Sequence, residues 1–105
     1  MEQRFIIATD SPKGFPNGVT VEERNKITRF LEAKQWQVWH WFDDLWLVVA
    51  PANSTTPRAL TKDLRKLLLK TRFVLIIEVD GRTTYSGFGS EYGWPWMEEN
   101  WGEAE

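Results

Sequence analysis

The chain of 105 residues contains no cysteine and a single histidine, His40. The missing cysteines exclude disulfide bonds, thiolate zinc sites and cysteine nucleophiles. One histidine excludes histidine-clustered metal sites and disfavours a serine triad. No apolar run approaches the roughly 20 residues that span a bilayer, and the start of the chain has no signal-peptide pattern. We therefore expect a cytoplasmic protein without membrane contacts.

The net charge is small, but the charged residues are unevenly placed along the chain. A net charge of −2 argues against a dedicated, high-affinity nucleic-acid binder. Between residues 58 and 72, however, six cations face one acid, Asp63, and from Glu91 onward every charge is negative. Either the two segments compensate each other within the fold, or the basic segment contacts phosphates. The candidate phosphate-binding residues are Arg58, Lys62, Arg65, Lys66 and Lys70.

Hydrophobic periodicity predicts one small domain of alternating strands and helices. Apolar, β-branched runs predict strands at 4–10, 36–42, 46–50 and 72–79. A capping-box pattern, Thr20 with Glu23, predicts a helix that ends near Lys34. The second helix is predicted to start with Thr56 as N-cap and Pro57 in the first turn. Its buried stripe is Leu60, Leu64, Leu67 and Leu68.

The predicted order is β-α-β-β-α-β, which right-handed crossovers fold into an α+β, ferredoxin-like sandwich. Asp80–Gly81 is a hairpin signal, so residues 83–88 are expected to return as a short fifth strand beside the fourth. We expect residues 1–93 to form the ferredoxin-like domain. Residues 94–105 form an aromatic, acidic tail that packs on the sheet or on a partner subunit, with a frayed end.

Seven tryptophans are an unusual number for this length. In the second strand, Trp39 and Trp41 share one face and His40 lies on the other, while helices cover only one face of such a sheet. Near-continuous apolar strands indicate burial on both sides. Either the tail or a second copy of the chain supplies the second cover, and a homodimer with exchanged tails combines both. The expected interface residues are Trp39, Trp41, Trp94, Trp96 and Trp101.

Acidic residues at strand ends are the candidates for chemistry. Asp10 ends the first strand beside a proline- and glycine-rich loop, where a carboxylate can hold a divalent cation such as Mg²⁺, helped by a second copy in a dimer. The alternative role for Asp10 is turn capping. Asp43 and Asp44 are explained by turn propensity alone. His40 acts either as a general base or as a packed structural histidine.

Four segments resemble a known group: "FIIATD", "DDLWLVVAPANSTTPRALTKDLRKLL", "FVLIIEVDG", and "YSGFG" followed by Trp94 and Trp96. The chain resembles the CRISPR-associated small adaptation endoribonucleases and their virulence-associated protein D and SinR-like relatives. This resemblance implies a ferredoxin-like homodimer in which Asp10 matches the strand-end acid that binds metal at the dimer interface. It also implies divalent-metal-dependent nuclease activity in some members and adaptor roles in others.

Two functions follow as hypotheses. The first is a dimeric, nuclease-related protein in which Asp10 is catalytic and binds Mg²⁺ and the basic helix meets nucleic acid. The second is a non-catalytic interaction module whose tail docks on a nucleic-acid-handling complex, which suits a phage or mobile-element protein in phage defence. A structural homodimer without a separate site is the third reading.

Overall fold

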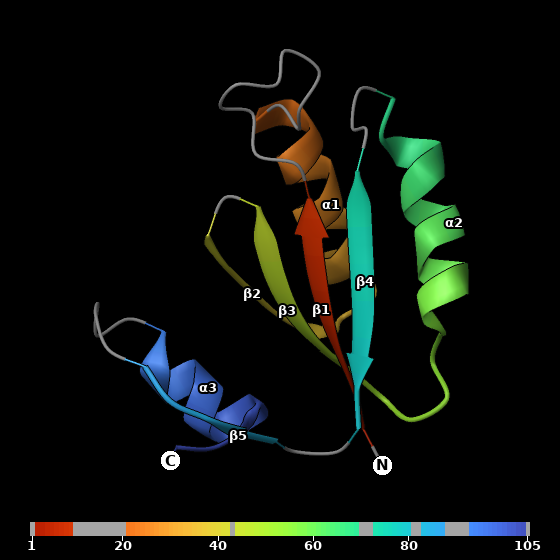
Figure 1. Ribbon diagram of the computed structural model, residues 1–105. Helices are drawn as coiled ribbons and strands as arrows, with labels where there is room; N and C mark the ends of the chain where they lie inside the picture. Colours follow the sequence, from red (N-terminus) through yellow and green to blue (C-terminus); the bar gives the residue numbers. More distant parts are fainter. Residues whose placement is uncertain are drawn as a thin grey trace.

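The computed structural model describes residues 2–9, 21–42, 44–69, 73–80, 83–87 and 93–104. It is a mixed α+β structure with a four-stranded antiparallel sheet in the order β2-β3-β1-β4 (Figure 1). A separate parallel pair, β5 and β6, accompanies the third helix. The elements are β1 (Gln3–Thr9), α1 (Val21–Ala33), β2 (Gln37–Phe42), β3 (Leu45–Ala50), α2 (Pro57–Leu67), β4 (Val74–Val79), β5 (Thr83–Tyr85), α3 (Trp94–Asn100) and β6 (Gly102–Ala104).

The start of α2 confirms the predicted capping. The Ala59 amide donates to Thr56 Oγ1 over 3.1 Å, and Pro57 occupies the first turn, where a missing N–H leaves no donor unsatisfied. The loop before this helix is held to β1, because Gln3 Oε1 accepts from the Ser54 and Thr55 amides at 2.8 and 3.2 Å. The helix therefore begins at a position that both its own sequence and β1 define.

The helix-covered face of the sheet carries the main core. Phe5 and Ile7 of β1 and Trp46 of β3 have no exposed surface, and the buried polar end of the Trp46 indole is satisfied because Nε1 donates to Thr28 Oγ1 over 2.9 Å. The predicted leucine stripe of α2 packs here. The buried members of this cluster are Phe5, Ile7, Ile27, Leu31, Trp46, Val48, Ala50, Leu60, Leu64 and Leu68.

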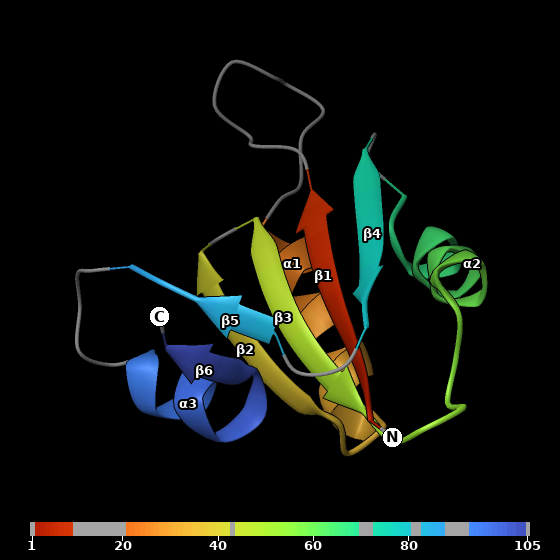
Figure 2. The same ribbon diagram turned by 60° about the horizontal axis from the view of Figure 1, so that its bottom comes forward.

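The opposite face is partly covered by the tail of the same chain. Figure 2 shows α3, β5 and β6 in front of β2 and β3, with α1 behind the sheet. Met97 and Trp101 pack with Leu47 and Val49 of β3. The tail is also fastened by Arg4, which is 3% exposed and whose Nε donates to the Asn100 carbonyl over 3.0 Å.

Two sequence predictions about the C-terminal part are wrong. Residues 83–85 do form a strand, but it does not return on β4: it pairs in parallel with β6, Thr83 opposite Gly102 and Tyr85 opposite Ala104. Parallel strands need a crossover between them, and α3 lies in that connection. Residues 102–104 are not frayed, because β5 pairs with them and Trp101, 4% exposed, anchors the strand that follows.

Candidate functional site

The outward face of α2 is a basic stripe, formed by Arg58, Lys62, Arg65 and Lys66, and all four side chains are exposed. At about 100° per residue, they fall within an arc of about 100°, opposite the buried Leu60 and Leu64. At about 1.5 Å of rise per residue, the stripe is about 12 Å long. Four of the five predicted phosphate-binding residues thus share one surface, and Lys70 lies outside the described residues.

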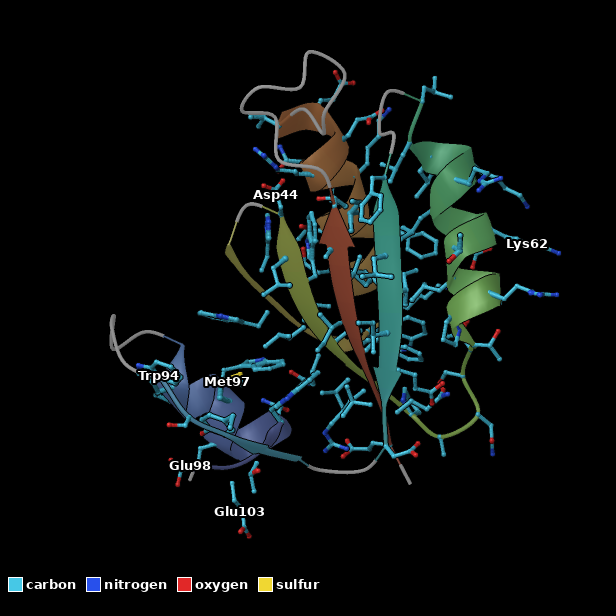
Figure 3. All side chains as sticks on the ribbon, viewed as in Figure 1. Asp44, Lys62, Trp94, Met97, Glu98 and Glu103 are labelled. Atoms are coloured by element: carbon cyan, nitrogen blue, oxygen red, sulfur yellow. The ribbon has the colours of Figure 1, made fainter. Side chains whose placement is uncertain are left out.

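The basic stripe is not neutralised within the part of the chain that the structure describes. The ion pairs found there join Arg4 to Glu2, Arg24 to Asp44 and Lys26 to Glu22, and none involves the stripe. Figure 3 places Lys62 on one flank of the molecule and Glu98 and Glu103 of the tail on the opposite flank. The alternative in which the acidic tail compensates the basic helix is therefore wrong for these residues, because the sheet separates them.

A second polar cluster lies where β1 ends. Arg24 of α1 is 8% exposed, and its Nη2 donates to Asp44 Oδ1 over 3.0 Å. The backbone carbonyl of Asp44 accepts a hydrogen bond from the Thr9 amide over 3.0 Å. The side-chain Oδ1 of Asp44 lies 3.5 Å from the Thr9 hydroxyl. Asp44 thus does more than turn the chain. It joins the β2–β3 connection to α1 and β1, and sequence reasoning missed Arg24 because no local pattern links positions 24 and 44.

The predicted magnesium site falls on the residue next to this cluster. Asp10 lies outside the described residues, so its role as a metal ligand stays a prediction. Within the described ranges, no group of three or more histidine, aspartate or glutamate side chains is arranged to hold a metal ion. The described part of this end of the sheet supplies a partly buried ion pair between Arg24 and Asp44, and Asp44 in turn accepts a hydrogen bond from the backbone of Thr9, the last residue of β1.

The tryptophans predicted as an interface come together within one chain. Trp39 of β2 stacks on Trp96 of α3, with ring centroids 6.2 Å apart and an interplanar angle of 29°. Trp94 stacks on Tyr85 at 6.2 Å and 4°, and Trp101 is buried. The register of β2 shifts between Trp39 and Phe42. The side chain of Trp41 is outside the described part, so its predicted place in the interface stays a prediction.

His40 packs flat against the buried Trp46 indole, with ring centroids 4.3 Å apart and an interplanar angle of 7°. Strand alternation correctly places it on the face opposite Trp39. One face of the imidazole ring is therefore occupied by its packing against Trp46.

The tail covers only part of the outer face. In the β1–β4 pairing, Leu75 lies opposite Ala8 and Ile77 lies opposite Ile6, on the outer face of the sheet. Leu75 and Ile77 are 46% and 45% exposed. We call Leu75 and Ile77 the uncovered half of the outer face. Such adjacent apolar side chains on a strand surface are typical of an interaction site.

Comparisons with protein-family models, curated proteins and solved structures found no match to this chain. Among the described residues, no helix combines the length and apolar character required to cross a membrane.

Proposed function

We propose that this protein binds the phosphate backbone of nucleic acid through the basic stripe of α2. The observation that carries the proposal is the set of four exposed cations on one helix face without an acidic partner among the described residues. Arginine and lysine at such spacing contact successive phosphates and position a strand without reading its bases. Because the net charge is −2, the attraction depends on this local concentration of cations and not on the overall charge of the chain.

The proposal has a quantitative signature in salt. Four phosphate contacts release condensed counterions, so the logarithm of the binding constant falls with the logarithm of salt concentration, with a slope of about −3 for a single strand. A protein that binds through bases or by apolar contact alone has a much shallower slope.

The first test neutralises part of the stripe. Lys62→Gln with Lys66→Gln removes two phosphate contacts, and we expect at least about ten-fold weaker binding of a labelled oligonucleotide and a salt slope smaller by about 1.5. Fluorescence anisotropy at several salt concentrations measures both. The matched control, Lys26→Gln with Arg29→Gln on α1, makes the same change in net charge. Equal weakening by both variants would show that only overall charge matters.

We further propose that the domain belongs to the ferredoxin-like class and is related to the nucleases that its sequence resembles. The β-α-β-β-α-β order and the antiparallel order β2-β3-β1-β4 support this assignment. In this proposal, Asp10 holds a divalent metal near the bound strand. Cleavage of RNA or DNA with Mg²⁺ or Mn²⁺ that Asp10→Ala abolishes, with the fold and strand binding retained, supports it. Wild-type protein that binds but cleaves nothing in a broad substrate panel leaves a non-catalytic binder.

A second copy of this chain is the partner we propose for the uncovered half of the outer face. Leu75 and Ile77 lie beside the part of the sheet that the tail covers. A second sheet can therefore stack on the part of this face that the tail leaves open, next to the tail. A two-fold contact would bring the same residues of both copies together. Concentration-dependent dimerisation in sedimentation experiments supports this role, and a monomer at all concentrations contradicts it.

A further inference from the structure

A hollow lies at the end of the sheet where the chain begins. Its volume is about 450 Å³, within the range of ligand-binding pockets. Its lining combines the aromatic residue Trp36 with polar residues and with small or apolar ones. The polar residues are Glu2, Gln35 and Gln37, and the small or apolar ones are Val49, Ala50, Pro51 and Ala52. It therefore combines an aromatic surface with hydrogen-bonding groups, a composition suited to a planar, polar ligand.

Trp36 is held in place and polarised by its neighbours. It is half-buried against the helix-side core, and the Lys34 ammonium lies 5.4 Å from its ring centroid and 5.0 Å from that of Phe30. Gln35 has a φ of 61°, a left-handed conformation that is uncommon for residues other than glycine. The α1–β2 connection is thus turned tightly, and it places an aromatic ring and a cation side by side.

The hollow is joined to the basic stripe by a short, fastened segment. Ala52 lines the hollow, and Arg58 opens the stripe six residues later, at most about 20 Å along an extended chain. Between them, Gln3 accepts from the Ser54 and Thr55 amides and donates from Nε2 to the Thr55 carbonyl at 2.8 Å. Figure 1 shows this segment leaving the end of the sheet at which the N-terminus lies.

We infer that the hollow receives an unstacked base of a single-stranded nucleic acid whose phosphates lie along α2. This inference rests on the proposed backbone binding and specifies its substrate as single-stranded. Every base has a π-face that can stack on the Trp36 indole. The Lys34 ammonium supplies positive charge for the adjoining phosphate, while the Gln35 and Gln37 amides supply hydrogen-bonding groups for the base edge. A duplex, whose bases are already stacked, cannot place one there.

The ligand itself provides the first test, without changing the protein. Wild-type protein is titrated by fluorescence anisotropy into a labelled ten-residue thymidine strand and into an abasic strand of the same length and charge. We expect the thymidine strand to bind about five-fold to 100-fold more tightly, the range of one base–aromatic stack. Equal binding of the two strands overturns the inference.

The second test locates the stacking surface. Trp36→Leu keeps an apolar side chain against the core but removes the stacking ring, so we expect it to bind both strands with the affinity of the abasic one. The matched control is Phe73→Leu, which removes an aromatic ring that is 56% exposed at the start of β4, and it should keep the wild-type preference. Urea unfolding of both variants shows whether the fold is retained. A preference that survives in folded Trp36→Leu overturns the assignment to this hollow.

The outcomes separate this inference from the proposed function. If both strands bind equally and Lys62→Gln with Lys66→Gln weakens both, backbone binding stands and the base site is wrong. If neither strand binds wild-type protein at low salt, both proposals fail. If the preference for the thymidine strand is lost only in Trp36→Leu, while the α2 variant weakens both strands alike, both proposals are supported.

Discussion

The two faces of the sheet are equally apolar in sequence, but they differ in what covers them. On the helix side, Phe5 and Ile7 are completely buried, whereas Leu75 and Ile77 on the other side are nearly half exposed. Two helices of 13 and 11 residues cover the first face, and a 7-residue helix with a two-stranded ribbon covers part of the second. An apolar strand face therefore indicates that another segment must bury it. The length of the covering segment determines how much of the face is buried.

The two covers also differ in how they are attached. The helix α1 lies between β1 and β2 in the chain, and α2 lies between β3 and β4, so both ends of each helix are attached to strands of the sheet. The tail arrives after the last strand and depends on individual contacts: the Trp39–Trp96 stack, the burial of Trp101 and the Arg4 hydrogen bond to Asn100. Because the interface between the tail and the sheet is small, the loss of one contact should remove a large share of the free energy that holds the tail in place.

The largest effect is expected on the helix-covered face. Trp46→Ala removes a completely buried indole that also donates to Thr28 Oγ1, so we expect the free energy of unfolding to fall by about 3 to 5 kcal/mol. Urea denaturation followed by circular dichroism measures this change. Leu75→Ala, a truncation at a half-exposed site, is the control and should cost much less. Similar losses in both variants would remove the contrast between the faces.

A smaller effect is expected under the tail. Met97 is 6% exposed and packs with Leu47 and Val49, so Met97→Ala should lower the free energy of unfolding by about 2 to 3 kcal/mol. The same urea measurement applies, and Glu103→Ala on β6 is the control because that side chain is exposed. If Met97→Ala behaves like Glu103→Ala, the tail does not cover the sheet of the chain in solution.

The smallest change in monomer stability is expected on the uncovered half. Leu75→Thr with Ile77→Thr keeps β-branched or β-compatible side chains while removing exposed apolar surface, so the free energy of unfolding at low protein concentration should change by about 1 kcal/mol or less. If a second copy occupies this half, sedimentation should show a wild-type dimer and a monomeric variant. A wild-type dimer that the double substitution leaves intact would place the interface elsewhere.

Local sequence patterns predicted much of the fold. Thr56 and Pro57 mark the start of α2 because capping depends on groups within three residues, and Leu60 and Leu64 are buried because helical periodicity aligns them. The basic stripe was predictable for the same reason, since its four cations occupy the opposite side of that helix. Alternation in β2 correctly separated Trp39 from His40, and it stopped being informative at the register shift before Phe42.

Contacts between distant positions escaped prediction. Asp44 was interpreted as a turn residue, although it pairs with Arg24, 20 positions away. The Asp80–Gly81 signal indicated a hairpin, but β5 pairs with β6 because the α3 crossover and the buried Trp101 stabilise that arrangement. The hollow at Trp36 also had no local signature, since its walls come from the start of β1, the α1–β2 connection and the end of β3.

The sequence by itself determined the order of the elements from β1 to β5, the cap of α2, its leucine stripe and its basic face, because each depends on neighbouring residues and on the helical or strand period. Only the tertiary structure decided which surface covers Trp39 of β2, where the tail strand pairs and how much of the outer face stays open. Those outcomes depend on contacts between segments up to 96 positions apart, such as Arg4 with Asn100. Several partners of similar apolar character compete for such contacts, and only the folded geometry selects among them.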